Sequence, residues 1–242
     1  MDETKPKSDG GSSDQNLSDL KGHKGHRQRL RERFMKGGVK AMADYEMLEL
    51  LLCMGIPRRD VKPLAKELIA YFGDFANVVE APADRLAEFK GMSATAVAAL
   101  KVVQASVLMI TKERIVKRPI LSNWQSLIEY LRAAMGHFER EQFRVLYLDR
   151  KNQLLADDVQ GDGSINHAPV YPREVVKRGL EVGASALIIV HNHPSGDPSP
   201  SKDDINMTNK VQKACQNLDM RLHDHVVICR SGHVSFKAQG LL

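Results

Sequence analysis

Two histidines and one aspartate in the second half of the chain have the residue types and spacing of metal ligands. His191 and His193 directly follow the apolar segment ALIIV, and Asp204 comes after a loop rich in Pro, Ser and Gly. Residues two apart in a strand point to the same side, so we expect both imidazoles to meet at the exit of a buried strand. Asp204 falls in the first turn of the next predicted helix and can supply a third ligand. Two His and one carboxylate with an open fourth position are typical of catalytic zinc, which polarises a carbonyl and lowers the pKa of a bound water to about 7.

Each part of this pattern has a simpler interpretation when taken alone. A lone His-x-His pair is usually incidental, and the loop after it is compatible with an ordinary proline-rich turn. Ser201 and Asp204 have the spacing of a capping box, in which Asp204 would only stabilise a helix N-terminus. The conjunction of a buried strand, His-x-His and Ser-x-x-Asp favours the metal site.

The elements around these residues indicate a mixed α/β domain. After Pro119, strand-forming segments alternate with helical ones. The pattern predicts helices over 122–135, 172–180 and 201–218, and strands over 143–148, 153–156, 186–190, 226–229 and 234–236. We expect Ser122 to cap the first of these helices.

The first half of the chain is predicted to be helical. Residues 1–20 are polar and are expected to form a disordered tail. Helices are expected over 41–54 and 60–72, within 77–89, and over 93–117, ending at Arg118-Pro119. The predicted division is therefore a tail (1–20), a helical domain (21–118) and an α/β domain (120–242).

Charge is unevenly distributed along the chain. The formal net charge is +5 over 242 residues, and all of the excess lies before residue 120. Residues 21–40 carry eight basic residues and one acidic residue. This asymmetry suggests a basic module that contacts a polyanion, joined to a neutral module. We find neither a signal peptide nor an apolar run of bilayer length, and three well-separated cysteines favour a reducing, cytoplasmic setting.

The metal-ligand pattern resembles a known family. His-x-His, seven residues, then Ser-x-x-Asp is the form of the JAMM motif of JAB/MPN metalloproteases, and HNHPSGDPSPS is similar to the RadC family, as is most of 120–242. The resemblance implies an α+β JAB/MPN zinc domain preceded by a small all-α, helix-hairpin-helix-like domain. It also implies Zn²⁺ bound by His191, His193 and Asp204. Ser201 would stabilise the tetrahedral oxyanion.

The resemblance further implies a glutamate on an early strand as general acid and base. The position aligned from Phe143 is Gln142, and Glu141 is one residue away, which in a strand reverses the face. Glu141 and Glu174 are therefore both candidates, and both could instead be surface charges. This departure leaves zinc binding intact but puts peptidase activity in question.

Other histidines have weaker assignments. His225 and Asp224 precede the strand VVIC and are candidates for orienting a ligand imidazole, with an ordinary buried or surface role as the alternative. His167 is expected in a loop at the rim of the site. His23 and His26 are expected to titrate in solvent.

Residues 86–97 resemble a helix-hairpin-helix, with Ser93 in place of the usual second glycine, and 52–61 resemble a degenerate partner. Such hairpins offer backbone N–H groups to phosphate, so the basic half is a candidate DNA-binding module, or else a solvated helical bundle.

The sequence thus predicts a zinc-dependent hydrolase of amide or isopeptide bonds acting on a peptide or protein. The alternatives are a DNA-associated scaffold with a structural or vestigial zinc site, and a metal-dependent hydrolase of nucleic acid. The oligomeric state is left open.

Overall fold

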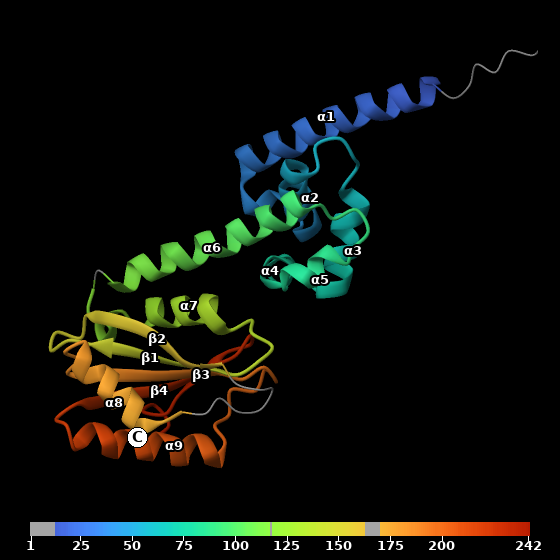
Figure 1. The fold of residues 1–242 in the computed structure, drawn as a ribbon. Coiled ribbons are helices and arrows are strands. Elements are labelled where there is room, and N and C mark those ends of the chain that lie inside the picture. Colours follow the sequence, from blue (N-terminus) through green and yellow to red (C-terminus); the bar gives the residue numbers. More distant parts are fainter. Residues whose placement is uncertain (1–12, 117, 163–169) are drawn as a thin grey trace, which may run out of the picture. The chain divides into compact units, whose positions relative to one another are not determined.

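A computed structural model describes residues 13–116, 118–162 and 170–242, and they form two compact units divided within one long helix. The division lies between Val103 and Gln104, earlier than the expected boundary at Arg118-Pro119. A helix, α1, begins at Ser13, inside the segment expected to be a disordered tail. The two units are described separately below (Figure 1).

The first unit is helical, as expected. Its elements are α1 (Ser13–Gly37), a 3-10 turn (Val39–Ala41), α2 (Asp44–Gly55), α3 (Lys62–Phe72), α4 (Phe75–Glu80), α5 (Ala83–Ala87) and the start of α6 (Ala94–Val116). The segment expected to hold one helix within 77–89 holds two, because Pro82 separates α4 from α5. Leucines of α2, α3 and α5 fill the core of this unit, together with Ala96 and Leu100 of α6.

Two helix–turn–helix hairpins, α2–α3 and α5–α6, meet at Gly55. A Cβ added to Gly55 would lie 2.6 Å from Cα of Ala96, so only glycine allows this approach. Ser93 caps α6 by accepting a hydrogen bond from the Ala96 N–H, and its hydroxyl donates to the Gly55 carbonyl. The serine in place of the expected glycine therefore both starts α6 and joins the hairpins.

The second unit is a three-layer α/β domain. Its sheet has the order β2-β1-β3-β4-β5, with β3 and β4 parallel and the other pairs antiparallel. The strands are β1 (Gln142–Leu148), β2 (Leu154–Asp162), β3 (Ala186–Asn192), β4 (Arg221–Ile228) and β5 (His233–Ser235). The helices are α7 (Trp124–Met135), after a 3-10 turn (Ile120–Asn123), α8 (Pro172–Glu181) and α9 (Lys202–Gln216).

Helix α7 covers one face of the sheet, and α8 and α9 cover the other (Figure 1). Alternate residues of β3 divide between the two layers: Ile188 and Val190 pack toward α7, whereas Leu187 and Ile189 pack toward α8 and α9. Strands β2 and β4 are longer than predicted. Ser122 does not cap α7; its hydroxyl donates to the Pro119 carbonyl, and the N-cap position is Asn123.

Helix α6 corrects one sequence expectation. It has an 18-residue window with a mean hydropathy of 1.7, so its length and composition would allow it to cross a membrane. Its buried residues, however, are divided between two cores: Leu100 packs in the first unit, and Ile115 packs under the sheet of the second. This packing accounts for part of the apolar character of the helix.

Candidate metal centre

His191, His193 and Asp204 converge at the carboxyl end of β3. Nε2 of His191 lies 2.9 Å from Nε2 of His193 and 3.4 Å from Oδ1 of Asp204. Nε2 of His193 lies 3.7 Å from Oδ2 of Asp204. Ligands bound tetrahedrally at about 2.0–2.1 Å from zinc are separated by roughly 3.3 Å, so these distances suit a shared zinc ion after small adjustments. This is the one group of three or more His, Cys, Asp or Glu donors with metal-site spacing among the described residues.

The strand and the helix position these side chains as the sequence predicts. His191 is the last residue but one of β3, which is buried along its whole length, and the backbone N–H of His193 donates to the Ile228 carbonyl at the end of β4. Ser201 is the N-cap of α9: its Oγ accepts from the Asp204 N–H at 3.1 Å, while its own N–H donates to Oδ2 of Asp204 at 2.7 Å. Asp204 therefore belongs to both the capping box and the ligand set, so the two interpretations of this residue are compatible.

The electrostatics of the cluster keep Asp204 ionised. Burial alone would raise the pKa of the Asp204 carboxyl, but the neighbouring His193 and His191 and the hydrogen bonds from Ser201 outweigh burial and hold the pKa well below its usual value. Burial lowers the pKa of His191 to about 4, although Asp204 opposes the shift. The Asp204 carboxylate raises the pKa of the more accessible His193, with a smaller contribution from Glu141.

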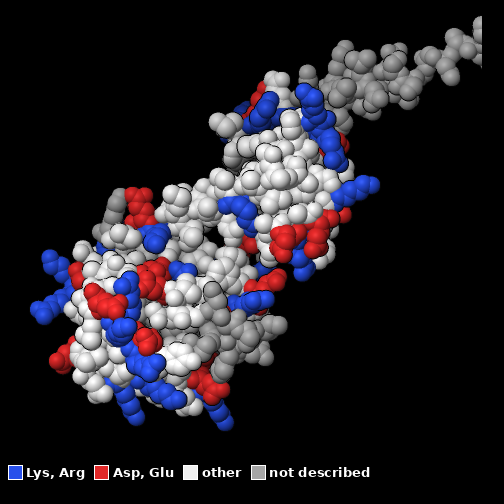
Figure 2. All heavy atoms as spheres, viewed as in Figure 1, with Lys and Arg blue, Asp and Glu red and all other residues white. Residues whose placement is uncertain are grey.

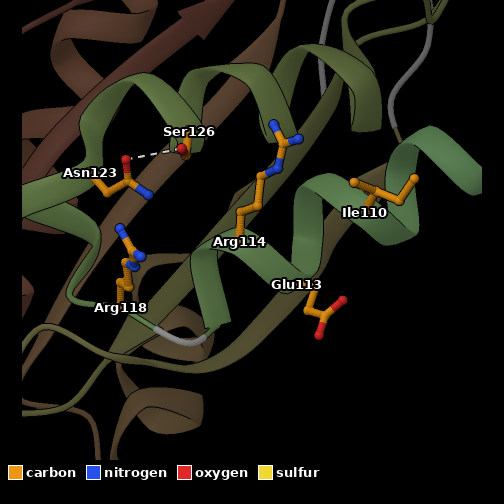
Figure 3. A pocket seen from close by; sticks show the side chains of 6 residues that line it. All are labelled: Ile110, Glu113, Arg114, Arg118, Asn123 and Ser126. Carbon is orange, nitrogen blue, oxygen red and sulfur yellow. Dashed lines mark hydrogen bonds between the residues drawn. The ribbon is translucent and has the colours of Figure 1, made fainter.

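Other hollows in the described part of the chain lie elsewhere. One of about 550 Å³ is lined by Arg114 and other residues of α6, by Ser126 of α7, and by Arg118 and Asn123 between these helices (Figure 3). Another of about 570 Å³ lies beside Trp124, His223 and β5. Neither is lined by a residue of the His–His–Asp cluster. We base the functional assignment on that cluster because it carries the convergent donor atoms.

Comparison with known proteins agrees with this geometry. The family described as RadC-like JAB domain matches residues 121–241, and the family described as UPF0758 N-terminal matches residues 23–98. The chain belongs to the UPF0758 (RadC) family. A UPF0758 protein of Ruegeria pomeroyi is 54% identical over 217 residues, which are 90% of this chain and 97% of the relative. A UPF0758 protein of Rhodobacter capsulatus is 54% identical over 213 residues, 88% of this chain and all of the relative.

Within this RadC-family domain, the two candidate glutamates lie in different places. Phe143 pairs directly with His191 across β1 and β3 and packs on the α8–α9 side. Glu141 lies one residue before β1, and its charge contributes to the raised pKa of His193. Gln142 instead accepts a hydrogen bond from Arg144. Glu174 is half-exposed on α8, accepts a hydrogen bond from Arg173, and lines a hollow with Asp158 and Arg178.

Asn192 holds the segment that carries Glu141. Its Oδ1 accepts from the Gln142 N–H at 2.8 Å, and its Nδ2 donates to the carbonyls of Arg140 at 3.0 Å and Phe138 at 3.3 Å. Asn192 itself is buried, whereas its three partners lie in a segment that is partly exposed. Sequence reasoning missed this role, although the residue lies between the two ligand histidines.

The structure gives different outcomes for the remaining predicted residues. His225 contacts His191, with His225 Nε2 2.7 Å from His191 Nδ1. Asp224, proposed with it, is not part of this contact: its carboxylate accepts from the Ser235 hydroxyl and the Lys237 N–H and anchors β5. His26 does not stand free in solvent, because its Nε2 lies 2.7 Å from Oε1 of the buried Glu49. His167 and the side chain of His23 lie outside the described residues.

Proposed function

We propose that this RadC-family chain is a zinc-dependent hydrolase of amide or isopeptide bonds. The observation that carries the proposal is the convergence of two imidazole nitrogens and one carboxylate at the end of β3. This donor set fits zinc and supplies three ligands, which leaves one position for water or substrate. A zinc ion held there supplies Lewis acidity toward a substrate carbonyl and lowers the pKa of water.

The residues around the cluster supply the other parts of such a reaction. Glu141 is the favoured general base, because it lies two residues before Phe143, which pairs with His191, and because its charge helps to raise the pKa of His193. In this role its carboxylate takes the proton from the attacking water and later gives it to the leaving amine nitrogen. The Ser201 hydroxyl lies 2.6 Å from Oδ2 of Asp204, and a rotation about its Cα–Cβ bond would direct it to a developing oxyanion.

The first test is the zinc content of the purified protein. We expect about one zinc per chain in the wild type, and little in His193→Ala, by elemental analysis. Equal zinc in both proteins would remove the proposal. Glu141→Gln should keep its zinc, because the glutamate is not a ligand.

The second test is hydrolysis of peptide and isopeptide-linked substrates by the zinc-loaded protein. Glu141→Gln should lose about 10²–10⁴-fold in rate. Glu174→Gln is the matched control and should retain activity. If only Glu174→Gln loses activity, the general base is reassigned. Metal-dependent nicking of DNA, lost in His193→Ala, would instead favour the nucleic-acid hydrolase.

We propose, as a second function, that the first unit contacts DNA through its phosphates. Exposed basic residues gather over α1 (Figure 2), and the Arg27 guanidinium donates to the carbonyls of Ile56, Pro57 and Arg59. This contact places the turn that carries Arg58 and Arg59 against α1, so basic residues of two segments share one surface.

DNA binding by such a surface should be independent of sequence and weaken steeply with salt. Fluorescence anisotropy with a short duplex at 50 and 200 mM salt measures both properties. Arg58→Ala should weaken binding, whereas His193→Ala should leave it unchanged. Binding that is insensitive to salt, or to Arg58→Ala, would contradict this function.

A further inference from the structure

A chain of buried hydrogen bonds leads away from His191 on the side opposite to the metal-facing nitrogen. Nδ1 of His191 lies 2.7 Å from Nε2 of His225. Nδ1 of His225 lies 2.6 Å from Oγ1 of Thr208, which in turn lies 2.6 Å from the backbone oxygen of Asp204. His225 and Thr208 are fully buried, and His191 is 4% exposed, so solvent does not compete for these bonds.

The donor and the acceptor of every bond in this series of hydrogen bonds follow from the last group, the Asp204 carbonyl. The Asp204 carbonyl can only accept, so the single hydroxyl proton of Thr208 is donated there. Oγ1 of Thr208 must then accept from Nδ1–H of His225. The ring of His225 is packed on that of Phe236, with centroids 4.3 Å apart, and full burial disfavours its charged form.

A neutral imidazole that donates from Nδ1 accepts at Nε2. His225 therefore accepts from Nδ1–H of His191, and the Nε2 lone pair of His191 is left to face His193 and Asp204. His193 also carries its proton on Nδ1, because Nδ1 lies 2.8 Å from the carbonyl oxygen of Asp197 and donates to it. Its Nε2 is therefore an acceptor as well. Two acceptor nitrogens 2.9 Å apart require a shared cation, either a proton or a metal ion.

We propose that Thr208 and His225 are positioning residues that fix His191 in the Nδ1–H tautomer, with Nε2 directed to the metal. The proposal rests on the zinc function above. It also gives α9 two tasks: the helix supplies the ligand carboxylate of Asp204 and, one turn later, the hydroxyl that orients His191. Hydrogen-bond partners of this kind change metal affinity by about 10–100-fold when they are removed.

The test compares two substitutions of one side chain. Thr208→Val removes the hydroxyl at nearly constant shape, whereas Thr208→Ser keeps it. Competition with a chelator should show zinc affinity about 10–100-fold weaker in Thr208→Val and unchanged in Thr208→Ser. The matched control is Thr111→Val, because the buried Thr111 hydroxyl likewise donates to a carbonyl within its own helix, that of Val107.

A second measurement needs neither zinc nor a variant. Long-range ¹H–¹⁵N NMR spectra of the metal-free wild type report which ring nitrogen of each histidine carries the proton. We expect Nδ1–H for His191 and for His225. An Nε2–H tautomer at His225, or equal zinc affinity in Thr208→Val and Thr208→Ser, would overturn the proposal that Thr208 and His225 fix the His191 tautomer. If the wild type binds no zinc, the proposed function fails, but the NMR spectrum still decides the tautomer of His225. The same spectrum decides the tautomer if Thr208→Val does not fold.

Discussion

Replacing Asn192 by Ala should weaken the second unit and loosen the segment that carries Glu141. The buried side chain makes three hydrogen bonds, to the Gln142 N–H and to the carbonyls of Phe138 and Arg140. Each such bond contributes about 1 kcal/mol net, so their loss should lower the free energy of unfolding by about 3 kcal/mol. With a urea m-value of about 2 kcal/mol/M, the unfolding midpoint should fall by roughly 1.5 M.

The assay is urea unfolding followed by the fluorescence of Trp124, the single tryptophan, which packs against the core under the sheet. The control is Asn217→Ala at the exposed end of α9, for which we expect a change within about 0.5 kcal/mol. Hydrogen exchange adds a local measurement, because the Gln142 amide should exchange faster in Asn192→Ala. Zinc content should stay near that of the wild type, since the three ligands are unchanged.

Three results would each refute part of the reasoning. An unfolding midpoint for Asn192→Ala equal to that of Asn217→Ala would show that the three bonds contribute little. Unchanged protection of the Gln142 amide would show that Asn192 does not hold the segment. A loss of zinc comparable to that in His193→Ala would mean that Asn192 acts on the ligands themselves and not on the Glu141 segment.

Three other perturbations test the packing and the electrostatics of the two units. Arg144→Ala should destabilise the second unit by about 3–5 kcal/mol in urea unfolding, because it leaves the 2%-exposed Asp157 carboxylate without its guanidinium partner. Tyr130→Phe should cost less, because it keeps the Arg144–Asp157 ion pair and removes only a hydroxyl that donates to Asp157 and accepts from Arg144. Gly55→Ala should lower the free energy of unfolding of the first unit by about 1–3 kcal/mol, because the added Cβ would meet the Ala96 backbone. Circular dichroism follows this unfolding, and Gly232→Ala, where a Cβ has open space, is the control. Burial, together with the charges of Arg221 and Lys237, lowers the pKa of His223, so on acidification the unfolded chain takes up a proton before the native state does. The free energy of unfolding should therefore fall as the pH drops from about 6.5 toward the lowered pKa. His223→Gln should flatten this dependence in urea midpoints measured at pH 8 and pH 5.5. A wild-type midpoint that does not change over that range would contradict the last of these expectations.

The parts of the site that sequence predicted correctly depend on short-range geometry. His191 and His193 share a side because strand residues alternate, and Asp204 enters the first turn of α9 because Ser201 is a good N-cap. The spacing of the motif is therefore enough to predict that the three candidate ligands converge. The family resemblance added the zinc chemistry.

The parts that the sequence left open or missed depend on pairing between distant segments. His225 reaches His191 because β3 and β4 are parallel neighbours with Ile189 opposite His225, a register that no local pattern contains. Thr208 had one usable signal, since it lies one helical turn after Asp204 on the same face. Phe143 alone does not decide between Glu141 and Gln142, whereas its pairing with His191 and the effect of the Glu141 charge on His193 favour Glu141.

The number of donors also bears on the choice between a catalytic and a structural zinc site. A structural zinc is closed by four protein ligands, whereas the described residues bring three donors together here. The other polar atoms of these side chains are already engaged: Nδ1 of His191 by His225, Nδ1 of His193 by the Asp197 carbonyl, and Oδ2 of Asp204 by Ser201. Each ligand is thus oriented by its own protein partner, and the donors left over face one another. Three convergent donors are the ligand number of a catalytic zinc site, so the donor set supports the proposed hydrolase.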